Sequence, residues 1–254
     1  MEALALVFPW EIYPLIFLVA VLYSSVGHGG ASGYLALFAL FGVAVPEIAP
    51  VVLVLNILVA STSFIRYNAS GFFSAKMLLP FVCLSVPAAY VGGALHISPE
   101  LFTLVLGVVL ILSALRIVIV QPDKHRFVEP PQSTLWKWGL PIGAILGLIS
   151  GMTGIGGGVF LSPVLLLARW ADVKRSAALA SAFIVLNSIS GLIGQLTRTT
   201  LSLHVLLPLA AVVVAGGAIG SYAGAERLKS RRLQIILSIV LIIAGAKLVL
   251  KSFY

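Results

Sequence analysis

The feature that most constrains this chain is a pair of glycine-rich stretches that interrupt very apolar sequence about half a chain apart. The first reads Gly-His-Gly-Gly at 27–30, and the second reads Gly-Ile-Gly-Gly-Gly at 154–158. Glycine is unfavourable inside a helix and lets the backbone turn. Irregular backbone at membrane depth is tolerated only where protein buries it or where it lines a cavity. A matched pair of such breaks is typical of a transporter substrate site.

The composition indicates an all-α polytopic membrane protein. Of the 254 residues, 60% are hydrophobic and 9% are charged, with a mean hydropathy of +1.13. A soluble domain of this length could not bury so much apolar surface. The net charge of +8 comes from basic residues clustered between apolar runs, which indicates orientation in a lipid bilayer and not binding to nucleic acid. The acidic start, with Glu2 and Glu11, predicts that the N-terminus is retained.

The two halves of the chain repeat each other. With an offset of 127, the glycines of the first break match those of the second, and Val54-Leu55-Asn56 matches Val185-Leu186-Asn187 at an offset of 131. Because the matches are collinear and include rare residues, we interpret them as a duplication. The sequence therefore predicts a first transmembrane repeat at 1–120, a polar cytoplasmic linker at 121–134 and a second transmembrane repeat at 135–254.

Each repeat is predicted to contain one glycine-broken segment and three apolar runs near the ~20 residues that a membrane-crossing helix needs. The broken segments are 12–43 and 135–170, and the runs are 46–66, 76–95, 99–120, 174–196, 203–225 and 233–250.

Charge counting favours a topology in which each broken segment turns back as a hairpin. The groups at 66–76, 116–137, 169–175 and 227–232 then share one side and carry 13 of the 16 Lys and Arg residues. If each segment crossed once, the basic residues would divide without bias. The positive-inside rule therefore predicts inverted repeats with both termini outside. Whether the hairpin arms cross fully or re-enter stays open.

The breaks suit an anion, because each opens a helix whose first backbone N–H groups and positive dipole end need no charged side chain to attract negative charge. The alternative is that these glycines only allow tight turns and close packing. Asn56 and Asn187 lie at mirrored depth and could donate hydrogen bonds to the same site, or could simply join helices, and Gln195 could extend that polar face. The candidate substrate-binding residues are Gly27, His28, Gly29, Gly30, Asn56, Gly154, Gly156, Gly157, Gly158, Asn187 and Gln195.

His28 has no counterpart in the second break, where Ile155 takes its place. It could bind an anion, carry a coupled proton, or bond a nearby carbonyl as a neutral ring. No Asp or Glu falls in the middle of an apolar run, which argues against a cation as substrate. The chain holds no Ser-His-Asp spacing, metal-binding histidine pair or Walker loop, so we expect neither catalysis nor a metal or cofactor.

The duplicated glycine signature, with Phe160-Leu-Ser-Pro163 after its second copy, resembles the TauE/SafE sulfite-exporter family along nearly the whole chain. The first copy departs from the family pattern at Ala31 and Ala36. The resemblance implies a carrier of sulfite, sulfonates or related organosulfur anions. We therefore predict a secondary transporter of a small anion, favouring a sulfur oxyanion, in a bacterial plasma membrane. Another carboxylated or inorganic anion, a membrane scaffold, and assembly into homo-oligomers stay open as alternatives.

Overall fold

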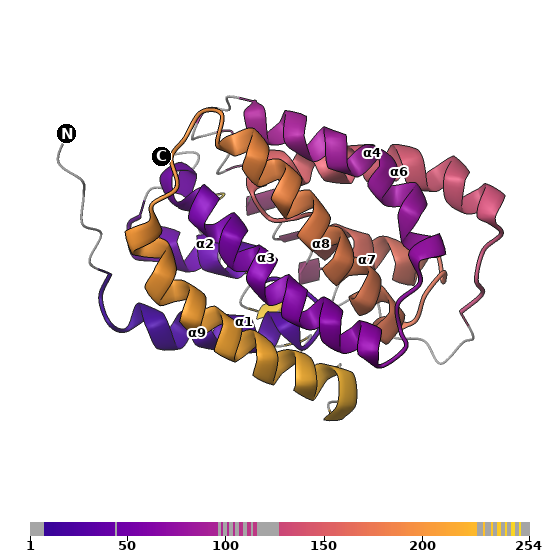
Figure 1. The fold of residues 1–254 in the computed structure, drawn as a ribbon, viewed down its shortest axis with the longest axis horizontal. Helices are drawn as coiled ribbons and strands as arrows, with labels where there is room; N and C mark the ends of the chain where they lie inside the picture. The colour runs from indigo at the N-terminus through magenta and orange to yellow at the C-terminus, as the bar shows by residue number, and fades with distance from the viewer. Residues whose placement is uncertain are drawn as a thin grey trace.

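The computed structural model describes residues 8–43, 45–95 and 127–227, together with single positions between 98 and 115 and between 231 and 249. This described part contains helices and no strand, which confirms the all-α prediction (Figure 1). Its elements are α1 (Ile12–Ser24), α2 (Ala31–Leu40), α3 (Val45–Ala69), α4 (Ala75–Ala94), α6 (Gln132–Thr153), α7 (Gly158–Leu167), α8 (Val173–Gln195), α9 (Leu203–Tyr222) and the π-helical turn η1 (Ala223–Arg227).

Both glycine breaks interrupt helices, as the sequence predicts. In the first, α1 ends at Ser24 and α2 begins after Gly30, whose φ of 94° favours glycine. In the second, α6 ends at Thr153 and α7 begins after Gly157, at a φ of 71°. The second helix of each pair has 10 residues and is therefore about 15 Å long, half of the ~30 Å hydrocarbon core.

Five of the described helices are long and apolar enough to cross a membrane, namely α3, α4, α6, α8 and α9 with η1. Four of them coincide, to within a few residues at each end, with the predicted runs 46–66, 76–95, 174–196 and 203–225. The predicted runs 99–120 and 233–250 fall mostly outside the described residues. The structure thus describes an integral, multi-pass membrane protein.

The first helix of each half packs against a helix of the other half. On α9, Gly216 lies against Phe17 of α1, Gly220 against Val21 and Gly224 of η1 against Ser25. The residue numbers of the contacting pairs increase together along both helices, so α1 and α9 run in the same direction. The absence of side chains on this face of α9 lets the two backbones approach closely.

The contact between α4 and α6 has the same form. Gly139, Gly147 and Gly151 of α6 lie against Pro80, Ser85 and Ala89 of α4, respectively. These helices therefore also run in parallel.

Helix α8 runs parallel to α4 and antiparallel to α3. The Ser190 hydroxyl of α8 donates to the Val86 carbonyl of α4 at 2.5 Å, and Gly194 lies against Tyr90 one turn further along both helices. In contrast, the start of α8 packs against Tyr67 near the end of α3. Figure 1 shows the result: α1, α3 and α9 run one way, and α4, α6 and α8 run the other way.

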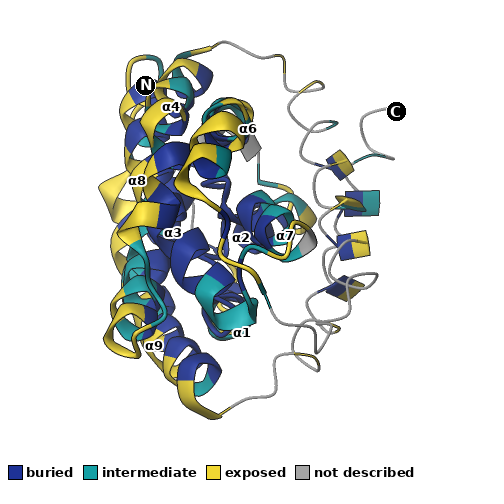
Figure 2. Cartoon of the chain, turned by 90° about the vertical axis from the view of Figure 1, so that its right-hand side faces the viewer, coloured by how far each residue is buried: buried dark blue, intermediate teal, exposed yellow. Residues whose placement is uncertain are grey.

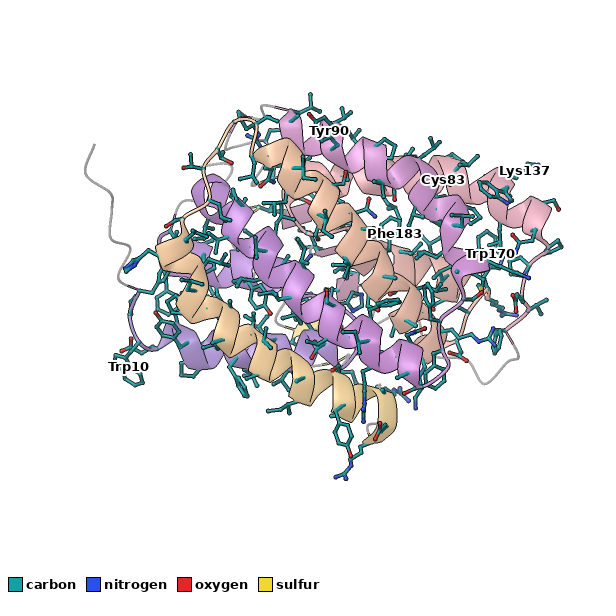
Figure 3. All side chains as sticks on the ribbon, viewed as in Figure 1. Trp10, Cys83, Tyr90, Lys137, Trp170 and Phe183 are labelled. Carbon is teal, nitrogen blue, oxygen red and sulfur yellow. The ribbon has the colours of Figure 1, made fainter. Side chains whose placement is uncertain are left out.

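One end of the molecule, which we call the basic end, gathers most of the described Lys and Arg residues. There Arg66 of α3 pairs with Glu226 of η1, and Lys174 donates to the Ala225 carbonyl at 2.7 Å. Arg175 also pairs with Glu129, at 3.4 Å. The opposite end carries Arg198, whose Nε donates to the Gly93 carbonyl at 2.8 Å. Partial burial lowers the pKa of this guanidinium, which stays cationic at neutral pH. In Figure 3, Lys137 marks the basic end and Trp10 marks the opposite end.

Large apolar side chains cover the outside of the helix bundle. Figure 2 shows buried residues toward the middle of the molecule, on α2 and α3, and exposed residues on the outer faces of α4, α8 and α9. Many of the exposed residues on these three helices are large and apolar, which suits contact with lipid: Leu79, Leu84, Tyr90, Val91, Leu186, Ile189, Ile193, Leu207, Val214 and Ile219.

Candidate functional site

Asn56, near the middle of α3, lies between the two glycine breaks and is fully buried. Its side-chain oxygen accepts a hydrogen bond of 3.1 Å from the N–H of Ala31, the first residue of α2. Its side-chain nitrogen donates to the Ile155 carbonyl in the second break at 3.2 Å and to Ser188 Oγ of α8 at 2.9 Å. One amide therefore joins both breaks and two long helices from different halves.

The glycines on either side of Asn56 are necessary for this arrangement. A Cβ atom on Gly29 would overlap the Asn56 side chain, and one on Gly156 would overlap the Asn56 amide and Ser188 Oγ. The two backbones can approach the amide only because neither carries a side chain. The structure thus brings Gly29, Asn56 and Gly156 together.

His28 also reaches from the first break to the second half. Its Nε2 lies 3.4 Å from Ser162 Oγ of α7, the backbone of Val26 and Gly158 lies close to the ring, and its buried Nδ1 meets no hydrogen-bond criterion within the described part of the chain. The nearby Tyr34 hydroxyl, which lies next to Gly30, is likewise buried without a described partner. Buried polar groups without partners are uncommon in native proteins and point to a bound ligand or water.

Polar atoms without described partners also lie beside the second break. Gln195 Nε2 donates to the Gly151 carbonyl at 3.3 Å and lies 3.6 Å from the place a Cβ on Gly154 would take. Its Oε1 is buried and unpartnered within the described residues, as is the hydroxyl of Ser150, whose Cβ lies near Gly157. The predicted residues Gly154 and Gln195 therefore lie together, on the side of Asn56 that faces the opposite end, whereas Gly157 lies next to Phe183 and Leu146.

Asn187 is placed differently from Asn56, although the sequence puts the two at equivalent positions. Its side-chain nitrogen donates to the Phe183 carbonyl of its own helix at 2.8 Å. Its side-chain oxygen is buried and has no partner among the described residues. Gly158, the first residue of α7, donates its N–H to Gly156 O at 2.9 Å and not to Asn187.

The electrostatics of this region favour negative charge. The positive N-terminal ends of α2 and α7 both lie at the breaks, and each carries backbone N–H groups that an intact helix would use internally. The described acidic residues lie at helix ends or in loops: Glu11, Glu47, Glu129, Asp172 and Glu226. Hydroxyl, amide and backbone N–H donors near helix N-termini can hold an oxyanion without a fixed cation.

Three neighbours of the breaks were not among the predicted site residues. Ser188 was missed because its equivalent position in the first half is Ile57, so the repeat gave no signal. Ser162 lies in the Phe-Leu-Ser-Pro stretch that follows the second break, and this motif could have indicated it. Tyr34 lies among apolar residues of α2, where an aromatic residue ordinarily indicates packing, so the sequence does not indicate it.

Two short helices that each begin at a glycine break, inside a set of membrane-length helices, are typical of a multi-pass membrane transporter. Comparison with known families agrees. The family model described as Sulfite exporter TauE/SafE matches residues 12–248. The chain belongs to this family, which confirms the resemblance drawn from its glycine signature.

Curated relatives carry transporter names as well. The chain is 35% identical over 233 residues to the probable membrane transporter protein y4hK of Sinorhizobium fredii, covering 91% of this chain and 94% of that relative. It is 33% identical over 112 residues to the probable membrane transporter protein MJ0441 of Methanocaldococcus jannaschii, covering 41% of each. No solved structure shows significant similarity to the chain. These names are consistent with the expectation of a protein that is not an enzyme.

Proposed function

We propose that this transporter carries a small oxyanion, a sulfur oxyanion or organosulfonate such as sulfite, across a bacterial plasma membrane. The observation that carries the proposal is that Asn56 joins the two glycine breaks from which α2 and α7 begin, with no described acidic side chain beside them. The ligand class follows from the donors, because backbone N–H groups, hydroxyls and amides complement oxygen atoms that share a negative charge.

In this proposal the anion lies between Gly27–Gly30 and Gly154–Gly158. Backbone N–H groups of the second break would supply donors, apart from those of Gly158, Phe160 and Leu161, which bond to Gly156 and Gly157. Ser162 and His28, 3.4 Å apart, supply side-chain donors from opposite halves. The unpartnered Tyr34 hydroxyl can donate from the first break.

The transport mechanism that fits this arrangement is alternating access around an inverted repeat. Equivalent helices run in opposite directions, since α1 and α3 point toward the basic end while α6 and α8 point away from it. The short helices α2 and α7 then return as re-entrant arms. The positive-inside rule places the basic end, with Arg66 and Arg175, in the cytoplasm. Each half would expose the site to one side of the membrane in turn.

The experiment that tests the substrate class is uptake into proteoliposomes of the purified protein. Radiolabelled sulfite, methanesulfonate and acetate would be compared at equal concentration, with protein-free liposomes as control. The proposal predicts saturable uptake of sulfite or methanesulfonate that unlabelled sulfite inhibits. Saturable uptake of acetate alone would favour the alternative of a carboxylate carrier. If none of the three anions is taken up, whichever way the protein is inserted in the liposomes, the proposal is refuted.

A further inference from the structure

We propose that Asn56 and Asn187 exchange hydrogen-bonding roles during transport, so that each caps the short helix of its own half in only one of two states. The proposal rests on the transport function proposed above. In the present state the Asn56 oxygen caps α2 through the N–H of Ala31. The equivalent bond of the second half would join the Asn187 oxygen to the N–H of Gly158, and it is not made. The asparagines are equivalent by sequence but not by geometry.

The packing of the two breaks shows the same difference. Gly27 lies so close to Ala177 of α8 that a Cβ atom would overlap that residue. At the equivalent Gly154, the nearest atoms to a Cβ belong to Gln195, Ala49 and Leu53 and lie 3.6–3.8 Å away, an ordinary contact distance. At this pair of equivalent positions the first break is therefore packed tightly against the opposite half, whereas the start of the second break, at Gly154, has room for a side chain.

Hydrogen bonds hold the first broken segment at the basic end. The Tyr67 hydroxyl donates to the Ser25 carbonyl at 2.7 Å, and Ser63 Oγ donates to the Ser24 carbonyl at 3.3 Å. At the offset of 131, the counterpart of Tyr67 in the second half is Arg198. Its guanidinium donates to Gly93 of α4 and not to the second broken segment. The second segment thus has fewer bonds to the helices around it.

These three differences indicate a state that is closed at the basic end and looser at the opposite end. Inverted repeats change state when the two halves exchange conformations. In the other state, Asn187 would leave Phe183 and cap α7 at Gly158, while Asn56 would release Ala31 and the bonds of Tyr67 and Ser63 would break. The unpartnered oxygen of Asn187 is the atom that this exchange would use.

Cysteine accessibility in the full-length protein tests the exchange. In a Cys83→Ser background, Ser176→Cys reports on the basic end and Ala49→Cys reports on the loose side next to Gly154. Both native residues are buried, at 1% and 3% exposure, so that labelling by a membrane-impermeant maleimide requires opening. Each reporter would be measured in membrane vesicles of both orientations, with Asn56→Ala, with Asn187→Ala and without either.

The two variants should shift labelling in opposite directions. Asn56→Ala weakens the present state, so labelling at position 176 should rise and labelling at position 49 should fall. Asn187→Ala loses only a bond within α8 in the present state but would lose the cap of α7 in the other state, so it should weaken the other state more and do the reverse. A change of roughly three- to tenfold is expected, the effect of one hydrogen bond on a two-state equilibrium. Ser181→Ala, which removes a hydroxyl bonded to Ala178 of its own helix, is the control and should change neither.

The outcomes separate the exchange from the transport function. If both asparagine variants shift labelling in the same direction, or if Asn187→Ala labels like the parent, the exchange is refuted even though the parent carries sulfite. A parent protein that carries none of the tested anions refutes the proposed function instead. If Asn56→Ala does not fold, Asn187→Ala decides alone, because it removes only a bond within α8.

Discussion

Asn56 and Ile155 lie 99 residues apart and are joined by a 3.2 Å hydrogen bond from the asparagine side chain to the isoleucine carbonyl. The bond connects α3 of the first half to the glycine break of the second. Together with the bond from Ala31, it makes one side chain the link between two helix breaks. The stability of this link can be measured separately from transport.

Removal of the Asn56 amide should destabilise the protein more than removal of the Asn187 amide. Asn56→Ala loses three hydrogen bonds. Loss of the bond from Ala31 leaves a buried backbone N–H without its partner. We expect a loss of about 1–3 kcal/mol, against about 0.5–1 kcal/mol for Asn187→Ala. Thermal unfolding of both variants in detergent measures the difference, and equal losses would contradict the assigned contacts.

Transport should be more sensitive to alanine at Gly156 than to alanine at Gly71. Both glycines have a φ of +78°, so both substitutions impose the same backbone strain. Only at Gly156 would the new methyl group overlap Asn56 and Ser188, whereas Gly71 has no neighbour within 4 Å of the added atom. Sulfite uptake should fall at least about tenfold in Gly156→Ala, the loss expected when one hydrogen bond to a charged group is broken. Equal uptake by the two variants would place the site elsewhere.

The contact between α1 and α9 should not tolerate a larger side chain at Gly220. A Cβ atom there would overlap the Val21 carbonyl and the Ser24 hydroxyl. Gly220→Val should cost about 1–3 kcal/mol, as overpacking of a close helix contact does. Ala218→Val, on the exposed face of the same helix, is the matched control and should leave the unfolding temperature unchanged. A Gly220→Val protein as stable as the control would show that the two helices do not pack in this register.

The topology predicts that 123–131 and 227–232 face the cytoplasm and that both termini face outward. Because Cys83 is exposed, it must be replaced before single cysteines are introduced. Cysteines at positions 124 and 229, outside the described residues, should be labelled only from the cytoplasmic side, and His204→Cys at the opposite end only from outside. Labelling of positions 124 and 229 from different sides would contradict the inverted repeat.

Much of this fold could be predicted from the sequence because its strongest signals are local. Glycine clusters end helices regardless of tertiary context, so the ends of α1 and α6 and the starts of α2 and α7 fall where the breaks predict them. The start of the second broken segment, predicted at 135, lies at Gln132 because α6 begins directly after Pro131. Proline at this point fits the end of an extended segment.

The partners of the polar residues could not be predicted in the same way. Asn56 and Asn187 occupy equivalent positions. The sequence around them does not indicate that Asn56 bonds across the molecule while Asn187 bonds within its own helix. That choice depends on how closely each break approaches the opposite half. That distance is set by tertiary packing and not by the residues next to either asparagine.

The most direct measurement is the position of a bound anion. Selenite, the selenium analogue of sulfite, would be added to the crystallised protein, and anomalous scattering would locate the selenium atom. The account predicts a peak between the two breaks, within hydrogen-bonding reach of backbone N–H groups of the second break and near Asn56 and His28. A selenium peak at any other place, or none at a concentration that saturates transport, would contradict it.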